Sequence, residues 1–418
     1  MGQSPLISIV IPTHNRCAQL LQTLAALEAQ TWPLADIDVV VVADACEDDT
    51  VERALAYAAQ APYRLQVLAH SARSAAKTRN YGAARAMGVT LLFLDDDVLP
   101  QPGLVEAHAL ARFDGRVVLG YSKPMVPAQP SWFQLDARRW WEDRFREIAQ
   151  PEHRFTYRDF FSGNVSLPAR LFRSVGGFDE DFNGRLEDYE LGLRLLDAGA
   201  RFCFEPAAVG YHYDFTDLDT WLRRIRQEGV ADVQIGQRHP ELRPTLLGNI
   251  EDVRGWWGPL LRDLAFAHPL RGAKLERYLL TIAGWLEQAH MRRTWQRVVR
   301  GLRKYNYWRG VGATVGGKRQ LAAWLQEAPV LPSVATNAPA IDLADLPPAE
   351  ELRRLLDRAT AQGVRVHIAG FEALVLPPQL GAEPLRLEHL HGAVRMLARR
   401  QFVPALALHL THTHIEAQ

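Results

Sequence analysis

The chain has 418 residues, more than a typical single domain, which predicts one large domain plus an addition. The composition is that of a globular protein, 48% hydrophobic and 23% charged, and 48 basic residues balance 48 acidic ones, so overall charge gives no argument for nucleic-acid binding. No stretch approaches the roughly 20 apolar residues of a membrane span, the N-terminus lacks a signal-peptide pattern, and three scattered cysteines fit a reducing compartment, so we expect a cytoplasmic protein.

Up to residue 94, apolar runs alternate with helical patterns. The expected elements are strands over 7–11, 38–42, 65–68 and 90–94 and helices over 16–30, 50–59 and 74–87. This alternation predicts crossover connections and an α/β fold, a Rossmann-like, mostly parallel sheet flanked by helices. Because ligands bind at the carboxyl ends of the strands in such sheets, the polar residues after each strand are candidates for a site.

Beyond residue 100 the pattern is mixed and then helical. Further strands are expected over 116–121, 160–167 and within 201–213, and a helix over 187–198. The expected organisation is a large catalytic α/β domain over 1–215, a helical, basic extension over 216–327, a Pro- and Ala-rich linker over 328–348 and a small α/β appendage over 349–418. The appendage pattern is helix, strand, strand, helix, strand. We expect residues 1 to about 330 to stay folded without it.

Three consecutive carboxylates, Asp95, Asp96 and Asp97, directly follow the strand over 90–94. Close to a buried strand they would repel one another, and a divalent cation bridging to diphosphate oxygens would compensate their charge. Hard oxygen ligands suit Mg²⁺ or Mn²⁺. The alternative is a solvated acidic turn that caps the helix after Pro100.

Polar residues also follow the first two strands. Pro12, Thr13 and Asn15 follow the first, and Asp44 ends the second. A carboxylate there can accept a hydrogen bond from a base N–H or a ribose hydroxyl. The alternative is that these side chains shape turns and cap the following helices.

Two further segments carry candidate ligand-binding residues. Arg79 lies beside Asn80 on the third helix, where a cation could reach a diphosphate, although a solvated helix face is the plain alternative. Gly163 and Asn164 are small and polar, and glycine lets the backbone approach a ligand closely.

Glu187 and Asp188 begin a helix. Acids are favoured at that position by the helix dipole alone. The functional alternative is that one of them is a general base that deprotonates an acceptor hydroxyl.

In this order, these segments resemble the family-2 glycosyltransferases of the GT-A fold. The resemblance covers about residues 4–213 and rests on IPTHNR, LDDD, GNVSLPARLFRSVGGFDE and LEDYELGLRL. The second strand ends in Ala-Asp-Ala-Cys where the family often has Asp-Asp-Gly-Ser, which leaves the contact of Asp44 open. The Gln-x-x-Arg-Trp signature of processive polymerases is missing.

The resemblance also implies roles for individual residues. The nucleotide base and ribose would contact Pro12, Thr13 and Asp44, and the donor site would include Arg79 and Asn80. The Asp-x-Asp block is Asp95, Asp96 and Asp97, with Asp97 as the direct metal ligand, and His212 lies at the metal or diphosphate. The general base is Asp188, with Glu187 as its competitor. A purely structural histidine is the alternative for His212.

The implied activity is the transfer of a sugar, with inversion, from a nucleotide sugar to an acceptor hydroxyl, assisted by Mn²⁺ or Mg²⁺. The expected donor is foremost a UDP-sugar. The acceptor would be a glycan, a lipid carrier, a peptide or a small molecule. A sugar-phosphate nucleotidyltransferase would need a glycine-rich loop where PTHNR stands. A non-catalytic nucleotide-sugar binder or scaffold predicts loss of acids that are present here.

The segment 290–319 is basic, has no acids and interleaves Trp295, Tyr305, Tyr307 and Trp308. A helix of this kind can lie on an anionic membrane surface, which would place the protein peripherally at the inner membrane face. The alternative is that it packs on the catalytic domain with its charges solvated.

Overall fold

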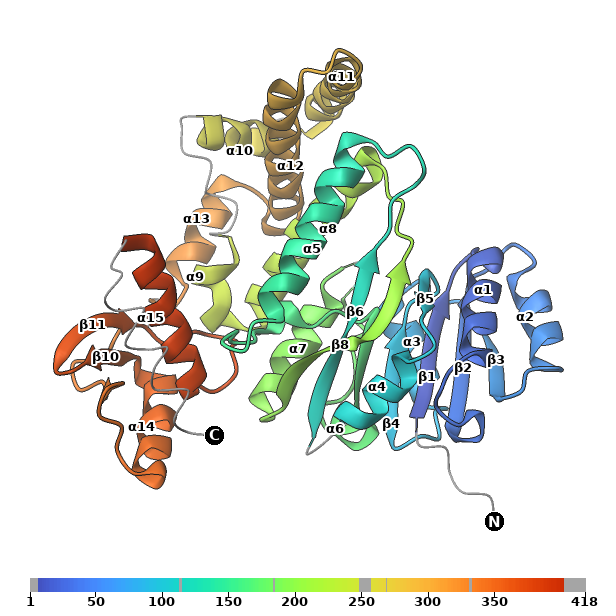
Figure 1. Ribbon diagram of the computed structural model, residues 1–418. Helices are drawn as coiled ribbons and strands as arrows, with labels where there is room; N and C mark the ends of the chain where they lie inside the picture. The colour runs from blue at the N-terminus through green and yellow to red at the C-terminus, as the bar shows by residue number, and fades with distance from the viewer. Residues whose placement is uncertain are drawn as a thin grey trace.

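The computed structural model describes residues 7–112, 115–182, 185–247, 257–267, 269–330 and 333–401. Its centre is an eight-stranded sheet in the order β3-β2-β1-β4-β7-β6-β8-β5 (Figure 1). The strands are β1 (Ile7–Thr13), β2 (Ile37–Asp44), β3 (Arg64–His70), β4 (Thr90–Leu94), β5 (Val98–Pro100), β6 (Arg116–Pro124), β7 (Asn164–Pro168) and β8 (Arg201–His212). Strands β3, β2, β1 and β4 are parallel, whereas β7 runs antiparallel to β4 and β6.

Both faces of this sheet are covered, which explains the uninterrupted apolar strands. Ile9 and Ile11 of β1 enter one hydrophobic cluster, and Val10 between them enters the other. The helices of this part are α1 (Cys17–Glu28), α2 (Thr50–Ala58), α3 (Ala75–Ala83), α4 (Leu104–Ala111), α5 (Trp132–Ile148), α6 (Ala169–Ser174) and α7 (Glu187–Asp197). The expected α/β fold with a mostly parallel sheet is confirmed.

Two local expectations differ from the structure. Residues 132–148 are rich in aromatic and charged side chains, and the sequence predicted no helix there. They form the 17-residue helix α5. The strand expected over 160–167 begins only at Asn164, because the preceding residues form a 3-10 turn (Tyr157–Asp159) and Phe160 is buried in the core.

A helical region follows the sheet, as expected. It consists of α8 (Leu218–Arg238), the short helix α9 (Arg243–Leu246), α10 (Trp257–Ala267), α11 (Pro269–Gln288), α12 (Arg292–Val315) and α13 (Lys318–Gln326). The four aromatic side chains that interleave the basic segment, Trp295, Tyr305, Tyr307 and Trp308, are all buried. Their burial favours packing on the protein over insertion into a membrane surface. In the part of the chain that the structure describes, no helix has the length and apolar character needed to cross a membrane.

The appendage is a second, small α/β unit. Its sheet has the order β11-β10-β9, with β9 (Ala340–Asp342), β10 (Val364–Ile368) and β11 (Phe371–Leu376), flanked by α14 (Ala349–Gln362) and α15 (Leu387–Gln401). Strand β9 comes from within the segment expected to be a linker. The last strand expected in the appendage falls outside the described residues.

The segment between β11 and α15 docks on the large domain beside the 3-10 turn. The Tyr157 N–H donates to the Gly381 carbonyl (2.9 Å), and the Glu383 N–H donates to the Phe155 carbonyl (2.9 Å). The side chain of Glu383 is buried and also accepts from the Phe155 N–H (3.1 Å). The appendage is therefore joined to the domain that carries the site.

Candidate functional site

A cleft of about 1650 Å³ opens at the carboxyl ends of the parallel strands and extends between α5, α7, α8 and α12. The candidates from the sequence that line it are Pro12, Thr13, Asn15, Asp44, Arg79, Asp95, Asp96, Asp97, Gly163, Asn164, Glu187, Asp188 and His212. Residues far apart in the sequence thus meet in one cavity, as the position of polar residues after the strands predicts.

The three acids after β4 have different environments. Asp96 is buried and turned inward, where it accepts hydrogen bonds from Thr13 Oγ1 (2.7 Å) and Arg16 Nη1 (2.8 Å). Burial raises the pKa of its carboxyl to about 6, and the charge of Arg16 only partly opposes this. Asp96 therefore fastens the acidic turn to the loop after β1.

Asp97 faces the cleft between two cationic groups. Arg16 Nη1 lies 2.7 Å from one carboxylate oxygen and His212 Nε2 lies 3.5 Å from the other. Burial opposes ionisation, but the hydrogen bond and charge of His212 and the charge of Arg16 hold the pKa of Asp97 at about 2. The pKa of His212 is raised in turn: burial lowers it, and the Asp97 carboxylate more than offsets this.

Asp95 and Glu187 are joined through one buried cation. Arg79 Nη2 donates to Asp95 (2.8 Å) and Arg79 Nη1 donates to Glu187 (3.0 Å). The Arg79 side chain is only 7% exposed. This guanidinium therefore connects the acidic turn after β4 with the acidic start of α7.

In the part of the chain that the structure describes, no basic side chain forms an ion pair with Asp188. Burial, and next the neighbouring charge of Glu187, raise the pKa of its carboxyl to about 7, although Arg185 and Arg79 oppose this. Leu186, the residue before Glu187, has a left-handed backbone conformation (φ 64°). This conformation is uncommon for a residue other than glycine and occurs preferentially at functional sites. A carboxyl titrating near neutrality at the edge of a cleft can accept and release a proton.

The end of the cleft beside β1, β2 and β3 is shaped by the loops that follow these strands. Asp44 accepts from the Arg73 and Ser74 N–H groups (2.9 Å each) and from Thr78 Oγ1 (2.8 Å). These bonds outweigh its burial and lower its pKa. Asn15 accepts from the Glu47 N–H (2.7 Å). Both side chains hold the loops together. This matches the alternative, left open by the sequence, that these residues shape the turns after the strands.

Two asparagines face away from the centre of the cleft. Asn80 exchanges hydrogen bonds with the Phe178 backbone (2.8 and 2.9 Å) and lines a separate hollow. It therefore does not lie beside the two carboxylates that Arg79 contacts. Asn164 lines the cleft, but its side chain bonds His108 (2.9 Å) and the Ala208 carbonyl (3.0 Å).

Gly163 lies against the acidic turn. A Cβ at this position would stand 2.8 Å from Asp95 Oδ2, closer than side-chain atoms normally approach. Its carbonyl also accepts from the Asp95 N–H (3.1 Å). The glycine therefore leaves the space in which the Asp95 carboxylate stands.

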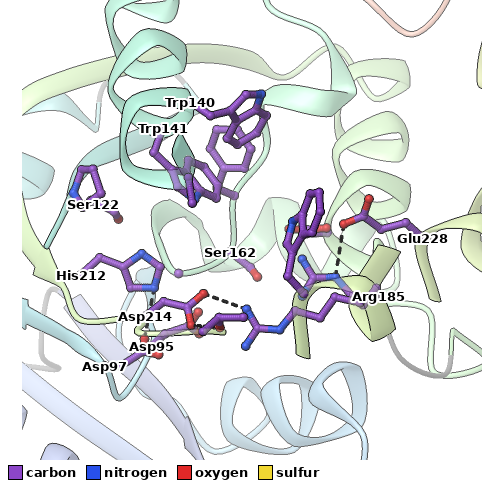
Figure 2. Close-up of a pocket in the computed structure, with 18 of the residues that line it drawn as sticks. Asp95, Asp97, Ser122, Trp140, Trp141, Ser162, Arg185, His212, Asp214 and Glu228 are labelled. Carbon is purple, nitrogen blue, oxygen red and sulfur yellow. Dashed lines mark hydrogen bonds and ion pairs between the residues drawn. The ribbon is translucent and has the colours of Figure 1, made fainter. Parts of the chain in front are cut away.

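The sequence missed the other half of the cleft. Its lining includes Trp140 and Trp141 of α5, Arg185 before α7 and Glu228 of α8 (Figure 2). Arg158 of the 3-10 turn lines it as well. The recurrence of aromatic residues through the charged stretch 132–148 was the available signal. It matches the helical period of α5, which places part of its apolar face toward the cleft.

Asp95, Asp97 and His212 offer an oxygen-rich donor set for a hard cation. Among the described residues, no three His, Cys, Asp or Glu side chains form a ready-made metal cluster. Magnesium and similar ions in phosphate-transfer sites are held by one or two carboxylates together with phosphate oxygens, rather than by an all-protein cage. The residues present fit a cation that binds together with a diphosphate.

Comparison with known proteins points to one family. The model described as glycosyl transferase family 2 matches residues 8–174, and that described as N-terminal domain of galactosyltransferase matches residues 142–217. A validoxylamine A glucosyltransferase of Streptomyces hygroscopicus subsp. jinggangensis (strain 5008) is 32% identical over 308 residues, which cover 65% of this chain and 70% of the relative.

More distant similarities follow. A pre-mycofactocin glycosyltransferase of Mycobacterium tuberculosis (strain ATCC 25618 / H37Rv) is 28% identical over 60% of this chain, which spans about half (52%) of that relative. A solved mannosyltransferase, PcManGT from Pyrobaculum calidifontis in complex with GDP-Man and Mn²⁺, has a TM-score of 0.48 at 20% identity, covering 72% of this chain and 86% of that structure.

Proposed function

This chain belongs to the family-2 glycosyltransferases and is a glycosyltransferase, and from that premise we propose that it transfers a sugar from a nucleotide-sugar donor, foremost a UDP-sugar, to an acceptor hydroxyl with inversion at the anomeric carbon. The observation that carries this proposal is the position of Arg79 between Asp95 and Glu187. One buried guanidinium brings the acids proposed to hold the donor beside the acids proposed to activate the acceptor.

The donor is held at the loops after β1 and β2. Pro12 and Thr13 face the nucleoside, and the loop organised by Asp44 forms the adjoining wall. Arg79 lies on the diphosphate side, where it stabilises negative charge that grows as the bond between the sugar and the diphosphate breaks.

A divalent cation, Mn²⁺ or Mg²⁺, belongs to this proposal. Asp97 and Asp95 would hold it with His212, and when bound it supplies further positive charge to the leaving diphosphate. Asp96 is already engaged by Thr13 and Arg16 and holds the turn in shape.

Asp188 acts as general base. The acceptor oxygen forms a bond to the anomeric carbon, the bond from that carbon to the diphosphate breaks, and Asp188 takes the hydroxyl proton. A single displacement needs no covalent nucleophile, so one base suffices. Glu187 accepts a hydrogen bond from Arg79 and so positions the guanidinium.

Calorimetry with UDP and MnCl₂ tests the donor site. Asp97→Ala should lose the manganese-dependent part of UDP binding, by about tenfold or more in affinity, because the variant removes a ligand of the cation. Asp49→Ala is the control, since Asp49 is an exposed acid that forms a surface ion pair with Arg53. Unchanged UDP affinity in Asp97→Ala would mean that the acidic turn serves only to cap structure.

A further inference from the structure

The half of the cleft away from β1 and β2 has features that donor binding does not use. Figure 2 shows Trp140 and Trp141 on the opposite side of the cavity from Asp95 and Asp97, with Arg185 and Glu228 at its end. Helices α5, α8 and α12 supply most of this wall. Asp188 lies at the border between the two halves, so a molecule in this half would present a group to the proposed base.

An exposed tryptophan pair forms one side of this half. The Trp140 side chain is 55% exposed although it lines a cavity, and its ring lies edge-on to Trp141 with centroids 4.8 Å apart. Trp141 in turn packs on Phe145 and Phe161, which fixes the pair on a rigid base. Aromatic surface of this size, left open in a preformed pocket, is typical of a site that covers an apolar ligand face.

Two arginines that line the same cleft have buried N–H groups without a partner among the described residues. Among the residues that the structure describes, the buried Arg185 Nε finds no hydrogen-bond acceptor, and Glu228 Oε1 stands 3.8 Å away, too far for a hydrogen bond. Arg158 donates through Nε to the Tyr157 hydroxyl (3.0 Å), but its buried Nη2 has no acceptor in the same part of the chain. Buried N–H groups without partners are rare in folded proteins, and ligand oxygens would satisfy both.

Charged groups of both signs stand close together at this end. Arg158 and Arg185 lie near the carboxyl groups of Asp188, Glu228 and Asp232, and the charges of Arg303 and Arg224 also act on Glu228. Arg224 is itself paired with Asp214 (2.7 Å). Three carboxyl groups among the arginines disfavour a bound anion, whereas a neutral ligand with several hydroxyl groups can both accept from arginine and donate to carboxylate.

We propose that this half of the cleft is an acceptor subsite for a neutral cyclic polyol, a sugar or cyclitol ring. One face of the ring covers the exposed Trp140, its rim contacts Trp141, and its hydroxyls bridge Arg185 to Glu228 and accept from Arg158. The proposal rests on the proposed function, because a further hydroxyl of the same ring faces Asp188. The ring is either a free small molecule or the end of a longer glycan, since both present the same surface.

Saturation-transfer NMR on the full chain tests the subsite directly. The probes are methyl β-glucoside and myo-inositol as neutral rings, sorbitol as an acyclic polyol, myo-inositol 1-phosphate as a charged ring, and cellotetraose as a glycan end. The neutral rings should bind, and sorbitol should bind about tenfold more weakly because it presents no flat apolar face. A cellotetraose affinity well above that of the glucoside identifies a glycan end, and equal affinities identify a free ring.

Two variants and a matched control complete the experiment. Trp140→Ala and Glu228→Gln should each weaken binding of the neutral rings by about tenfold or more, while leaving UDP affinity within about twofold. Trp285→Ala is the control, because Trp285 is 66% exposed on α11, outside the cleft, and its loss should change neither. Preferential binding of the phosphorylated ring, or ring affinity that survives in Trp140→Ala, would overturn the subsite.

Donor hydrolysis and UDP calorimetry, measured on the same preparations, separate this inference from the proposed function. A wild-type protein that binds UDP with manganese and hydrolyses the donor, yet shows no ring binding, overturns the subsite alone. Ring binding without any nucleotide binding supports the subsite and overturns the donor assignment.

Discussion

At the residue scale, the pKa of Asp188 links the geometry to a measurable rate. Burial and the charge of Glu187 raise this pKa to about 7, so below pH 7 the carboxyl holds its proton and cannot accept another. Transfer should therefore rise with pH through about 7 and level off above it. Asp188→Asn should lower transfer by roughly 100-fold or more and abolish this rise, with UDP affinity unchanged.

The comparison variant for this prediction is Glu187→Gln. Glu187 contacts Arg79, so its loss should act on the donor side. The rise of transfer with pH should remain but move to lower pH, because the charge of Glu187 helps to raise the pKa of Asp188. Transfer kinetics from pH 5 to pH 9, beside UDP calorimetry, check both variants. Near-normal transfer by Asp188→Asn would refute the assignment, and a flat pH profile in Glu187→Gln would move the base one residue earlier.

Gly163 gives a second prediction at this scale. Gly163→Ala should weaken manganese-dependent UDP binding by about tenfold without unfolding the protein, because the added Cβ would stand 2.8 Å from Asp95 Oδ2 and displace that carboxylate. Gly284→Ala is the control, since a Cβ there meets no atom within 4 Å. Calorimetry and thermal unfolding measure the two effects, and equal UDP affinity in both variants would contradict the role given to this glycine.

The residue scale also shows where a sequence pattern stops being informative. Arg79 and Asn80 were expected together at the donor, but successive helical residues point to different sides, so only one could face the cleft. The other, Asn80, holds the Phe178 backbone instead. Likewise, an Asp triplet does not reveal which carboxylate turns inward, and only the positions of Thr13 and Arg16 identify it as Asp96.

At the element scale, elements defined by local periodicity were predictable. The apolar runs of β1, β2 and β4 and the acidic start of α7 lie where the sequence places them, because a strand covered on both faces must be apolar throughout. Helix α5 was missed because its many charges and aromatic residues obscure the apolar stripe of a helix. Strands β5 and β9 were missed because each has only three residues, too few to show an alternating pattern. The acceptor half of the cleft, built largely from α5, was missed with it.

The crossing of α8 and α12 supports a further prediction. A Cβ at Gly310 would lie 1.9 Å from the Arg226 carbonyl oxygen, and one at Gly229 would lie 2.2 Å from the Tyr307 carbonyl oxygen, so the two helices touch backbone to backbone. Gly310→Ala should force them apart and lower the free energy of unfolding by about 3 kcal/mol. Acceptor affinity should fall with it, since both helices line that half of the cleft.

Gly301→Ala is the matched control on the same helix. The nearest atom to its added Cβ is 3.9 Å away, an ordinary contact, so the more helix-favouring residue should raise stability by about 0.5–1 kcal/mol. Urea unfolding of both variants provides the measurement. The crossing would not depend on glycine if Gly310→Ala were as stable as Gly301→Ala.

At the scale of the whole molecule, the appendage is the feature that the sequence describes least well. A Pro- and Ala-rich stretch predicts a separable unit, yet β9 comes from that stretch and Glu383 is buried against the large domain. These contacts join residues more than two hundred positions apart, which no local pattern encodes. They also border the 3-10 turn that carries Arg158, so the appendage braces part of the acceptor half of the cleft.

The sequence predicts that residues 1 to about 330 stay folded without the appendage. From these contacts we expect that part alone to be less stable than the full chain. Removing the appendage uncovers Phe155 and Tyr157, which are 6% and 3% exposed in the full chain. It also leaves the Phe155 N–H without Glu383, so the turn carrying Arg158 should loosen. Thermal unfolding should show a clear drop in Tm, and binding of neutral ring probes should weaken more than binding of UDP.

A single substitution separates this bracing from the mere loss of the appendage. Glu383 accepts from Phe155 and Arg386 and is 2% exposed, so Glu383→Ala breaks a buried, charged contact and should cost about 3 kcal/mol of unfolding free energy. Glu388→Ala, at an exposed acid in the first turn of α15, should cost almost nothing. If Glu383→Ala unfolds with the wild-type midpoint and binds ring probes normally, the docked segment is a passive neighbour of the turn. A lowered midpoint together with weakened ring binding and unchanged UDP affinity would instead show that the C-terminal unit sets the geometry at which the acceptor, and not the donor, is bound.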